Sequence, residues 1–362
     1  MPATSVLLDN GQTFRYVSNE PTSLDSISVI DVAGIYSSKL EDRKAVAEQI
    51  REASHNIGFF YMINHGIDSR CANVALHEAK RFFQLPEEDK MEVVVGTVPG
   101  EYVGFHPMEH YNRNRLKHRG TASCSARSLL VSKTDKCLID LMEAFNFAYD
   151  ASQDPEAVDS SEPSLSIWPS SAPEFRTAMY AYHTQLLQLA RRLTGIFALA
   201  LHLPEDFFDE YVKNPEAGMR VVHYPTQQNS RDDHLGIGAH TDVECFTFVT
   251  QDDCGGLEVL SKEGSWIKAD PIPGAMVVNI ADCFMRQTND FFVSTIHRVI
   301  NQSGKERYSA PFFFGFDKSK VLEPVPTCVS DGNPMKYPIM TAGEYYSWRT
   351  SKNKQNAAIK IA

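Results

Sequence analysis

Residues 236–260 read GIGAHTDVECFTFVTQDDCGGLEVL, in which strand-like runs are separated by turn residues. Runs such as FTFVTQ and LEVL around a glycine-containing turn are typical of antiparallel β-structure. His240 and Asp242 lie near the start of this stretch, two positions apart. Residues i and i+2 of an extended segment point to the same side. Both side chains can therefore face one metal ion.

A third candidate ligand is His297, which lies in FFVSTIHRVINQ (291–302). Two imidazoles and one carboxylate form the facial triad that suits non-haem Fe(II) and leaves three positions open for small ligands. The pair His240 and Asp242 is weak evidence by itself, because a chain with 12 His and 46 acidic residues holds about 1.5 such pairs by chance. Together, the three residues are predicted to bind iron and to form the catalytic centre.

The segment after residue 217 consists of short strand-like runs punctuated by turns. Many short strands at close spacing predict an antiparallel barrel or a double-sheet jelly roll. The runs are MRVVHYP (219–225), FTFVTQ (246–251), LEVL (257–260), WIKAD (266–270), AMVVNIAD (275–282), STIHRVIN (294–301) and RYSAPFFFGFD (307–317).

The segment before residue 205 is richer in helical patterns. Apolar residues at alternating steps of three and four predict a long helix over 174–201, packed on a large surface. The fold is therefore predicted to be α+β, a jelly-roll core flanked by helices. We expect one domain over 1–362, with a helix-rich part at about 25–205, an iron-binding core at about 218–318 and a closing helix at about 340–358.

Composition limits the classes of partner. A net charge of −11 argues against nucleic acid and anionic membranes, which attract basic surfaces. The seven cysteines include no CxxC pair, which favours reduced thiols and a cytoplasmic protein. No apolar run is long enough to cross a bilayer, and the N-terminus does not resemble a signal peptide. We expect a small-molecule substrate, and no obligate protein partner is evident.

Alternation in two strands predicts a binding site for a carboxylate. In RYSAPFFFGFD, Arg307, Ser309 and Phe313 share one face. Burying an arginine is costly unless it meets an anion, and its planar fork suits a carboxylate. In MRVVHYP, Arg220 and Tyr224 share a face, so Tyr224 can add a hydrogen bond to that carboxylate. An iron site beside such a cradle implies 2-oxoglutarate as co-substrate.

Residues 93–136 are rich in Gly, Tyr, His and Arg and have no sustained period. A long irregular segment of this kind is more often a binding loop than a plain surface loop, which remains the alternative. Its candidate substrate-binding residues are Tyr102, Phe105, Met108 and Arg113.

The order HTD, STIHRV, RYS closely resembles the isopenicillin N synthase-like superfamily of Fe(II)/2-oxoglutarate dioxygenases. Further landmarks, among them ISVIDV, GFFYMINHGI, FFQLPEEDK, VVNIAD and TAGEYY, extend the resemblance over roughly residues 27–350. It implies a jelly-roll core and Fe(II) on the three predicted ligands. It also implies 2-oxoglutarate on Arg307, Ser309 and Tyr224, with O2 at the remaining iron position. Decarboxylation to succinate and CO2 would then accompany hydroxylation, desaturation or rearrangement at a substrate C–H bond.

Within the superfamily, MRVVHYP and RYSAPFFF most resemble fungal thymine hydroxylase and fungal secondary-metabolite oxygenases. In that branch the position of Arg220 contacts an oxygenated planar substrate, and the position of Phe313 stacks on it. For Arg220 the alternative is a structural arginine paired with an acidic loop residue, and for Phe313 it is the barrel core. TVPGEYVGF (97–105) departs from the pyrimidine hydroxylases. We therefore expect an aromatic or polyketide-type metabolite of secondary metabolism rather than thymine.

Two other functions remain open at this point. An oxidase on the same scaffold would use Fe(II) and O2, and would hold the substrate's own carboxylate on Arg307 and Ser309. A non-catalytic jelly-roll binding protein would need no iron. Release of succinate coupled to O2 uptake separates the first alternative from the main prediction, and tight Fe(II) binding separates the second.

Overall fold

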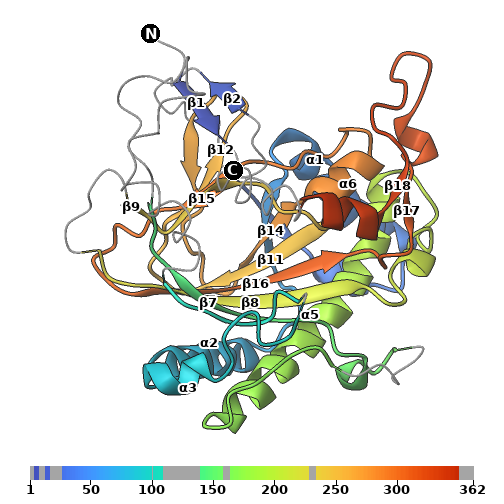
Figure 1. Cartoon of the computed structure of the whole chain (residues 1–362). Coiled ribbons are helices and arrows are strands. Elements are labelled where there is room, and N and C mark those ends of the chain that lie inside the picture. The colour runs from blue at the N-terminus through green and yellow to red at the C-terminus, as the bar shows by residue number, and fades with distance from the viewer. Residues whose placement is uncertain are drawn as a thin grey trace.

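The fold is a double-stranded β-helix, or jelly roll, with helices packed on one side (Figure 1). The computed structural model describes residues 4–7, 13–16, 27–99, 101–108, 139–157, 164–227 and 234–349. Its largest sheet has eight strands in the order β3-β4-β14-β11-β16-β8-β7-β5. These strands are β3 (Ser28–Asp31), β4 (Phe59–Ile63), β5 (Gly104–His106), β7 (Glu143–Phe147), β8 (Glu216–Tyr224), β11 (Phe246–Gln251), β14 (Met276–Ile280) and β16 (Arg307–Gly315).

A second sheet of four strands faces the first and has the order β10-β15-β12-β13. It consists of β10 (Ile237–His240), β12 (Leu257–Leu260), β13 (Trp266–Lys268) and β15 (His297–Val299). Three pairs of very short strands complete the β-structure: β1 (Thr4–Leu7) with β2 (Thr13–Tyr16), β6 (Ile139–Asp140) with β9 (His234–Leu235), and β17 (Val321–Leu322) with β18 (Met340–Thr341).

The outward face of the large sheet packs against helices. The long helix α5 (Pro173–Ala200) lies along this face, and its buried stripe includes Tyr182, Leu186 and Leu193. Its partners in the same core are aromatic residues of the sheet, such as Phe312. The other helices of the described residues are α1 (Leu40–Asn56), α2 (Ser69–Phe83), α3 (Glu87–Met91), α6 (Asp282–Gln287), a C-terminal helix over 342–349 and the 3₁₀ turns η1 (Ala33–Tyr36), η3 (Ala151–Gln153), η4 (Asp209–Tyr211) and η5 (Pro326–Cys328).

The inward face of the large sheet has a separate, smaller core. Tyr61, Val222, Tyr224 and Val277 pack there against residues of the small sheet such as Val259. The strand pairing explains this division, because successive residues of a strand point to opposite faces. The space between the two sheets is therefore lined by a different set of side chains from the one that contacts the helices.

The long helix and the core strands follow the sequence prediction closely, whereas the ends of the chain differ in detail. The first residues of the described chain contain β1 and β2. Strand β3 ends at Asp31, because the next residues turn into η1. Within the predicted binding loop, residues 104–106 form β5 at the edge of the large sheet. The predicted closing helix covers residues 342–349 of the described chain. None of the described helices is long and apolar enough to cross a membrane.

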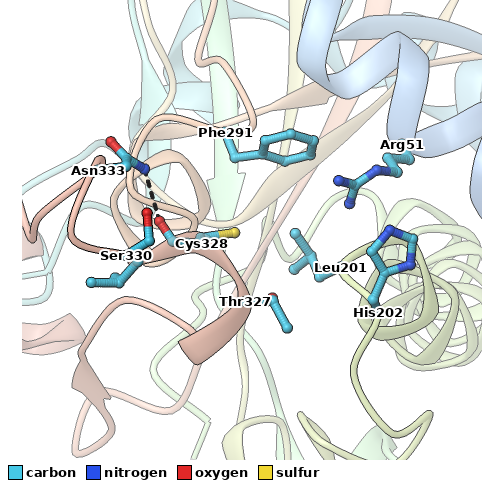
Figure 2. Close-up of a pocket in the computed structure, with 9 residues that line it drawn as sticks. Arg51, Leu201, His202, Phe291, Thr327, Cys328, Ser330 and Asn333 are labelled. Atoms are coloured by element: carbon cyan, nitrogen blue, oxygen red, sulfur yellow. Dashed lines mark hydrogen bonds between the residues drawn. The ribbon is translucent and has the colours of Figure 1, made fainter.

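A pocket of about 180 Å³ lies where helix α5 ends, and none of the predicted iron ligands lines it. Figure 2 shows the guanidinium of Arg51 and the ring of His202 at one side of this pocket. Nη1 of Arg51 donates to the carbonyl of Ala200 at 2.5 Å, and its guanidinium carbon lies 4.1 Å from the centre of the Phe291 ring. These contacts satisfy a carbonyl at the helix end, so the role of Arg51 is structural.

Candidate functional site

His240, Asp242 and His297 come together at one end of the space between the sheets. His240 ends β10, His297 begins β15, and the two residues are directly opposite one another in the strand pairing. Oδ1 of Asp242 lies 3.7 Å from Nε2 of each histidine. Ligand atoms that share one ion at bonds of about 2.1 Å can be at most about 4.2 Å apart, so each histidine can share an ion with Asp242, and the three ligand atoms all lie within 4.8 Å of one another.

Both histidines are held in the form that a metal requires. Nδ1 of His240 donates to the carbonyl of Gly238 at 2.8 Å, and Nδ1 of His297 donates to the carbonyl of Thr295 at 3.1 Å. A proton on Nδ1 leaves the lone pair on Nε2, which faces Asp242. The backbone thus sets both the tautomer and the orientation of each ring.

The charges at the three residues also suit a cation. Burial lowers the pKa of His297 to about 4, and the neighbouring His240 adds to this effect, so the ring of His297 is neutral at pH 7. Burial opposes the charge of Asp242, but His297, His240 and two hydrogen bonds outweigh it and hold the pKa of Asp242 below its usual value. A neutral imidazole and an ionised carboxylate are the forms that bind a divalent metal.

Two residues that sequence reasoning did not single out fix the carboxylate. Oδ2 of Asp242 accepts hydrogen bonds from Thr247 Oγ1 at 2.6 Å and from Asn279 Nδ2 at 2.8 Å. Both donors are fully buried, Thr247 in β11 and Asn279 in the otherwise apolar β14. With Oδ2 occupied in this way, Oδ1 is left to face the two histidines. A buried polar residue on the inward alternation of FTFVTQ and of MVVNI was the signal that could have found them.

Arg307, the centre of the predicted carboxylate cradle, is buried and held by three hydrogen bonds. Arg307 is 1% exposed. Its Nε donates to Gly255 O at 2.6 Å, Nη1 to Ser309 Oγ at 3.1 Å and Nη2 to Gln251 Oε1 at 2.9 Å. A guanidinium has five N–H groups, so these bonds leave one N–H on each terminal nitrogen. Two N–H groups on a fixed fork match the two oxygens of a carboxylate.

Tyr224 lies directly beside Arg307, as the alternation predicted. The two residues are partners in the pairing of β8 with β16, and the guanidinium carbon lies 4.8 Å from the centre of the tyrosine ring. The ring also packs closely against Gly236, where an added Cβ would come within 2.8 Å of it. Tyr224 is 3% exposed, and both contacts restrict the position of its ring.

Exposure rises along the inward face from the cradle toward the other end of β8 and β16. Arg307, Ser309, Val222 and Tyr224 are buried, whereas Phe313, Arg220 and Gly218 are only partly buried. Phe313 is the partner of Gly218 on one side and of Thr247, which donates a hydrogen bond to the predicted iron ligand Asp242, on the other. A Cβ on Gly218 would meet only one atom within 4 Å, at 3.7 Å. The inward face is therefore fully buried around the cradle and only partly buried beside Phe313.

The candidates from the predicted binding loop separate into three groups. Tyr102 is half-exposed and its ring packs edge-on against His106, which is buried on the inward side of β5. Met108 is partly buried beyond the end of β5, and Arg113 lies outside the described residues. Phe105 requires a correction, because it points outward into the aromatic core and its ring contacts Phe82. The parity of β5 places it on the helix side of the sheet, so we leave it out of the proposed site.

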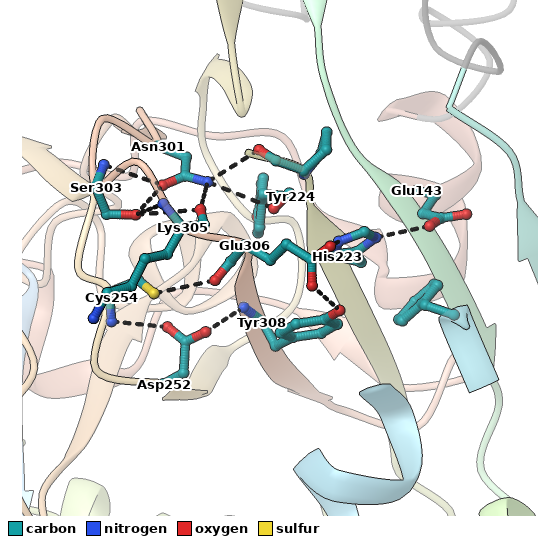
Figure 3. A network of polar contacts seen from close by, with 12 residues as sticks. Glu143, His223, Tyr224, Asp252, Cys254, Asn301, Ser303, Lys305, Glu306 and Tyr308 are labelled. Atoms are coloured by element: carbon teal, nitrogen blue, oxygen red, sulfur yellow. Dashed lines mark hydrogen bonds and ion pairs between the residues drawn. The ribbon is translucent and has the colours of Figure 1, made fainter. Parts of the chain in front are cut away.

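A network of charged residues supports the cradle from the outward face (Figure 3). His223, the neighbour of Tyr224, bonds through Nδ1 to Glu143 Oε1 at 2.7 Å, and Glu143 pairs with Lys90 at 3.1 Å. The ring of His223 stacks on Tyr308, the neighbour of Arg307, with centroids 4.7 Å apart. The backbone N–H of Tyr308 donates to Asp252. These contacts hold β8 and β16 in register where they carry Tyr224 and Arg307.

Comparisons with known proteins agree with this geometry. Residues 215–316 match the model of the 2OG-Fe(II) oxygenase superfamily, and residues 27–171 match that of the non-haem dioxygenase in morphine synthesis N-terminal family. The 2-oxoglutarate-Fe(II) type oxidoreductase ppzC of Metarhizium rileyi is 35% identical, over 94% of this chain and 91% of the relative. The 2-oxoglutarate-Fe(II) type oxidoreductase hxnY of Emericella nidulans is 34% identical, over 86% of each chain.

A solved structure shares the fold. A full-length Neurospora crassa protein, crystallised in complex with alpha-KG and thymine, superposes with a TM-score of 0.76 at 23% identity, over 93% of this chain and 99% of the other. The jelly roll, the cluster of two histidines and one aspartate, and the extent of these matches lead to one assignment. The chain belongs to the 2OG-Fe(II) oxygenase superfamily and is an oxidoreductase that uses Fe(II) and 2-oxoglutarate.

Proposed function

We propose that this enzyme oxidises a C–H bond of a small aromatic or polyketide-type metabolite at the open end of the barrel, beside Phe313. The observation that carries the proposal is the gradient of exposure along β8 and β16, from a closed cradle at Arg307 to a partly open surface at Arg220 and Phe313. The space beside the iron ligands is thus accessible where an aromatic ring and a cation line it.

The residues of the chain divide the work among them in this proposal. His240, Asp242 and His297 hold Fe(II), which supplies the activation of O2 when bound. Arg307, Ser309 and Tyr224 bind the distal carboxylate of 2-oxoglutarate and orient the other end of the molecule toward the iron. Thr247 and Asn279 keep the carboxylate of Asp242 turned toward the two imidazoles.

Arg220 and Phe313 are proposed to choose the substrate. The ring of Phe313 offers an apolar surface on which a planar group can stack, and such contacts contribute about 0.5–1.5 kcal/mol beyond area burial. Arg220 lies on the same inward face of β8 as Gly218, beside Asn146 of β7. Asn146 Nδ2 donates to the carbonyl of Tyr102, which places Tyr102 at this end of the barrel, and Met108 follows nearby in the chain. A keto or phenolic oxygen on the substrate suits a guanidinium here.

The N-terminal part of the chain is proposed to form one domain with the jelly roll. Strands β3 and β4, which precede residue 64, pair into the same sheet as β14 and β16. An unfolded N-terminal part would therefore leave the edge of β14 open.

The test is a screen of phenolic, heteroaromatic and polyketide metabolites, with succinate and O2 measured together. We expect one succinate to be released for each O2 consumed, and only when the substrate is present. Phe313→Ala should lose this coupling between succinate release and substrate oxidation. A control variant, Phe316→Ala, removes a buried ring of the outward core and should leave the choice among substrates unchanged in folded protein. Oxidation of a substrate without succinate would favour an oxidase, and turnover only with aliphatic amino acids would contradict the proposed substrate class.

A further inference from the structure

The C-terminal helix reaches the iron site through one buried arginine. Arg349, 5% exposed, donates from Nη2 to both the carbonyl and the hydroxyl of Thr241, at 3.3 and 3.1 Å. Thr241 lies between the two proposed ligands His240 and Asp242. Arg349 thus holds Thr241 in place, and the position of Thr241 sets the distance between the two proposed ligands on either side of it in the chain.

A buried carboxylate joins this contact to the third ligand. Oδ2 of Asp282 pairs with Nε of Arg349 at 3.1 Å and accepts from Tyr345 at 3.0 Å, while Oδ1 accepts from Ser294 Oγ at 2.7 Å. Ser294 precedes His297 by three residues. The backbone N–H of Asp282 donates to the carbonyl of Asp242 at 3.0 Å. Asp282 therefore contacts both segments that carry the ligands.

We propose that Arg349 is a positioning residue for the iron site, and that docking of the C-terminal helix is coupled to metal binding. The inference rests on the proposed assignment of His240, Asp242 and His297 as ligands. A guanidinium suits this position because its fork can serve Asp282 and Thr241 at the same time, which a lysine ammonium cannot do with the same geometry. Partners one step beyond the ligands typically change metal affinity by about 10- to 100-fold.

The experiment is a titration of the folded, metal-free protein with Mn(II), followed by the electron paramagnetic resonance of free Mn(II). Arg349→Met is expected to weaken Mn(II) binding about tenfold. Arg349→Lys should recover part of this loss. Thr241→Val keeps the ion pair of Arg349 with Asp282 and is expected to weaken binding about threefold, because it removes the hydroxyl that accepts from Arg349 and donates to Asp282 at 3.4 Å. If Arg349→Met does not fold, Thr241→Val decides the matter, since unchanged affinity there would overturn the proposal.

The matched control is Arg191→Met. Arg191 forms a partly buried ion pair with Asp154, at 2.8 and 2.6 Å, between α5 and the segment after η3. Its loss should lower the melting temperature without changing Mn(II) affinity. Equal weakening of Mn(II) binding by Arg191→Met and Arg349→Met would show a general effect of instability and would overturn the inference. Asp242→Ala separates the two proposals: natural affinity in that variant would refute the ligand assignment itself, whereas loss there with unchanged affinity in Arg349→Met would refute only the role of Arg349.

Discussion

The two faces of strand β16 differ in what they contribute, although they are built from neighbouring residues. Tyr308, Phe312 and Phe314 point outward into an aromatic core against the helices. Arg307 and Ser309 point inward and form the proposed seat of a carboxylate. A substitution on the outward face should change the free energy of unfolding, and one on the inward face should change ligand binding. Within this one strand, odd-numbered residues such as Arg307 are proposed to serve ligand binding, whereas even-numbered residues such as Phe312 serve stability.

The largest expected effect belongs to the inward side, at the iron. His297→Ala removes one of three proposed ligands and should weaken Mn(II) or Fe(II) binding by at least about a thousandfold. The melting temperature of the metal-free protein should change little, because the ring contributes to the site rather than to the helix-side core. Calorimetric titration with Mn(II) measures the first quantity, and retention of natural affinity would refute the ligand assignment.

On the outward side, Phe312→Ala should lower the free energy of unfolding by about 3–5 kcal/mol, because it leaves a cavity beneath α5. Phe312 is fully buried, and its ring is stacked with that of Phe248 and lies edge-on to His183. The affinity of the folded variant for 2-oxoglutarate should stay within about twofold of the natural value. Urea unfolding and 2-oxoglutarate titration together check the prediction, and a large loss of affinity would show that the two faces are not independent.

A smaller effect is expected for Arg307→Lys, which keeps the charge but removes the fork. Loss of two charge-assisted bonds, at about 1.5 kcal/mol each, should raise the dissociation constant of 2-oxoglutarate by about a hundredfold. Mn(II) affinity measured without 2-oxoglutarate should be unchanged. The neighbouring outward variant Tyr308→Phe serves as the control, since it lies one residue away on the other face. Equal effects of Arg307→Lys and Tyr308→Phe on the dissociation constant of 2-oxoglutarate would show that the two faces of β16 do not have separate roles.

The smallest expected effect is a pH dependence that comes from the outward core. Burial lowers the pKa of His183 to about 4, although its bond to the carbonyl of Ala217 opposes the shift. In the unfolded chain His183 takes up a proton below about pH 6.5, whereas in the folded protein it does so only below about pH 4. The stability of the fold therefore falls as the pH drops through this window. The loss should be about 2 kcal/mol at pH 5.

His183→Gln, which can still donate to that carbonyl, should abolish this part of the pH dependence. Urea unfolding of the two proteins at pH 7 and pH 5 measures the difference between them, so that the contributions of other groups cancel. Identical pH dependence in both proteins would show that folding does not lower the pKa of His183.

The sequence predicted the fold, and the faces of the candidate site residues, wherever polar and apolar residues follow the regular period of a helix or a strand. Alternation placed Arg307 and Ser309 on one face of their strand and Tyr224 on one face of another, and the pairing of β8 with β16 brings Tyr224 opposite Arg307. It failed for Phe105, because no period is visible in the glycine-rich segment around it and the parity of β5 could not be assigned. Nor could sequence reasoning find Arg349, because its partners Thr241 and Asp282 lie 108 and 67 positions away in the chain. Contacts of that range depend on how the last helix docks.

The pairing of β16 with β8 on one side and β11 on the other also limits how a gene for this protein can diverge. Deleting one codon between Ser309 and Phe313 would reverse the faces of every residue on one side of the deletion relative to the other. Either the cradle residues would then point toward the helices, or the aromatic residues of the helix-side core would point into the space between the sheets. We therefore expect related proteins to differ in the length of the loops near Phe313, where new substrates can be selected. Strand β16 should differ among them only by substitution and should keep its length.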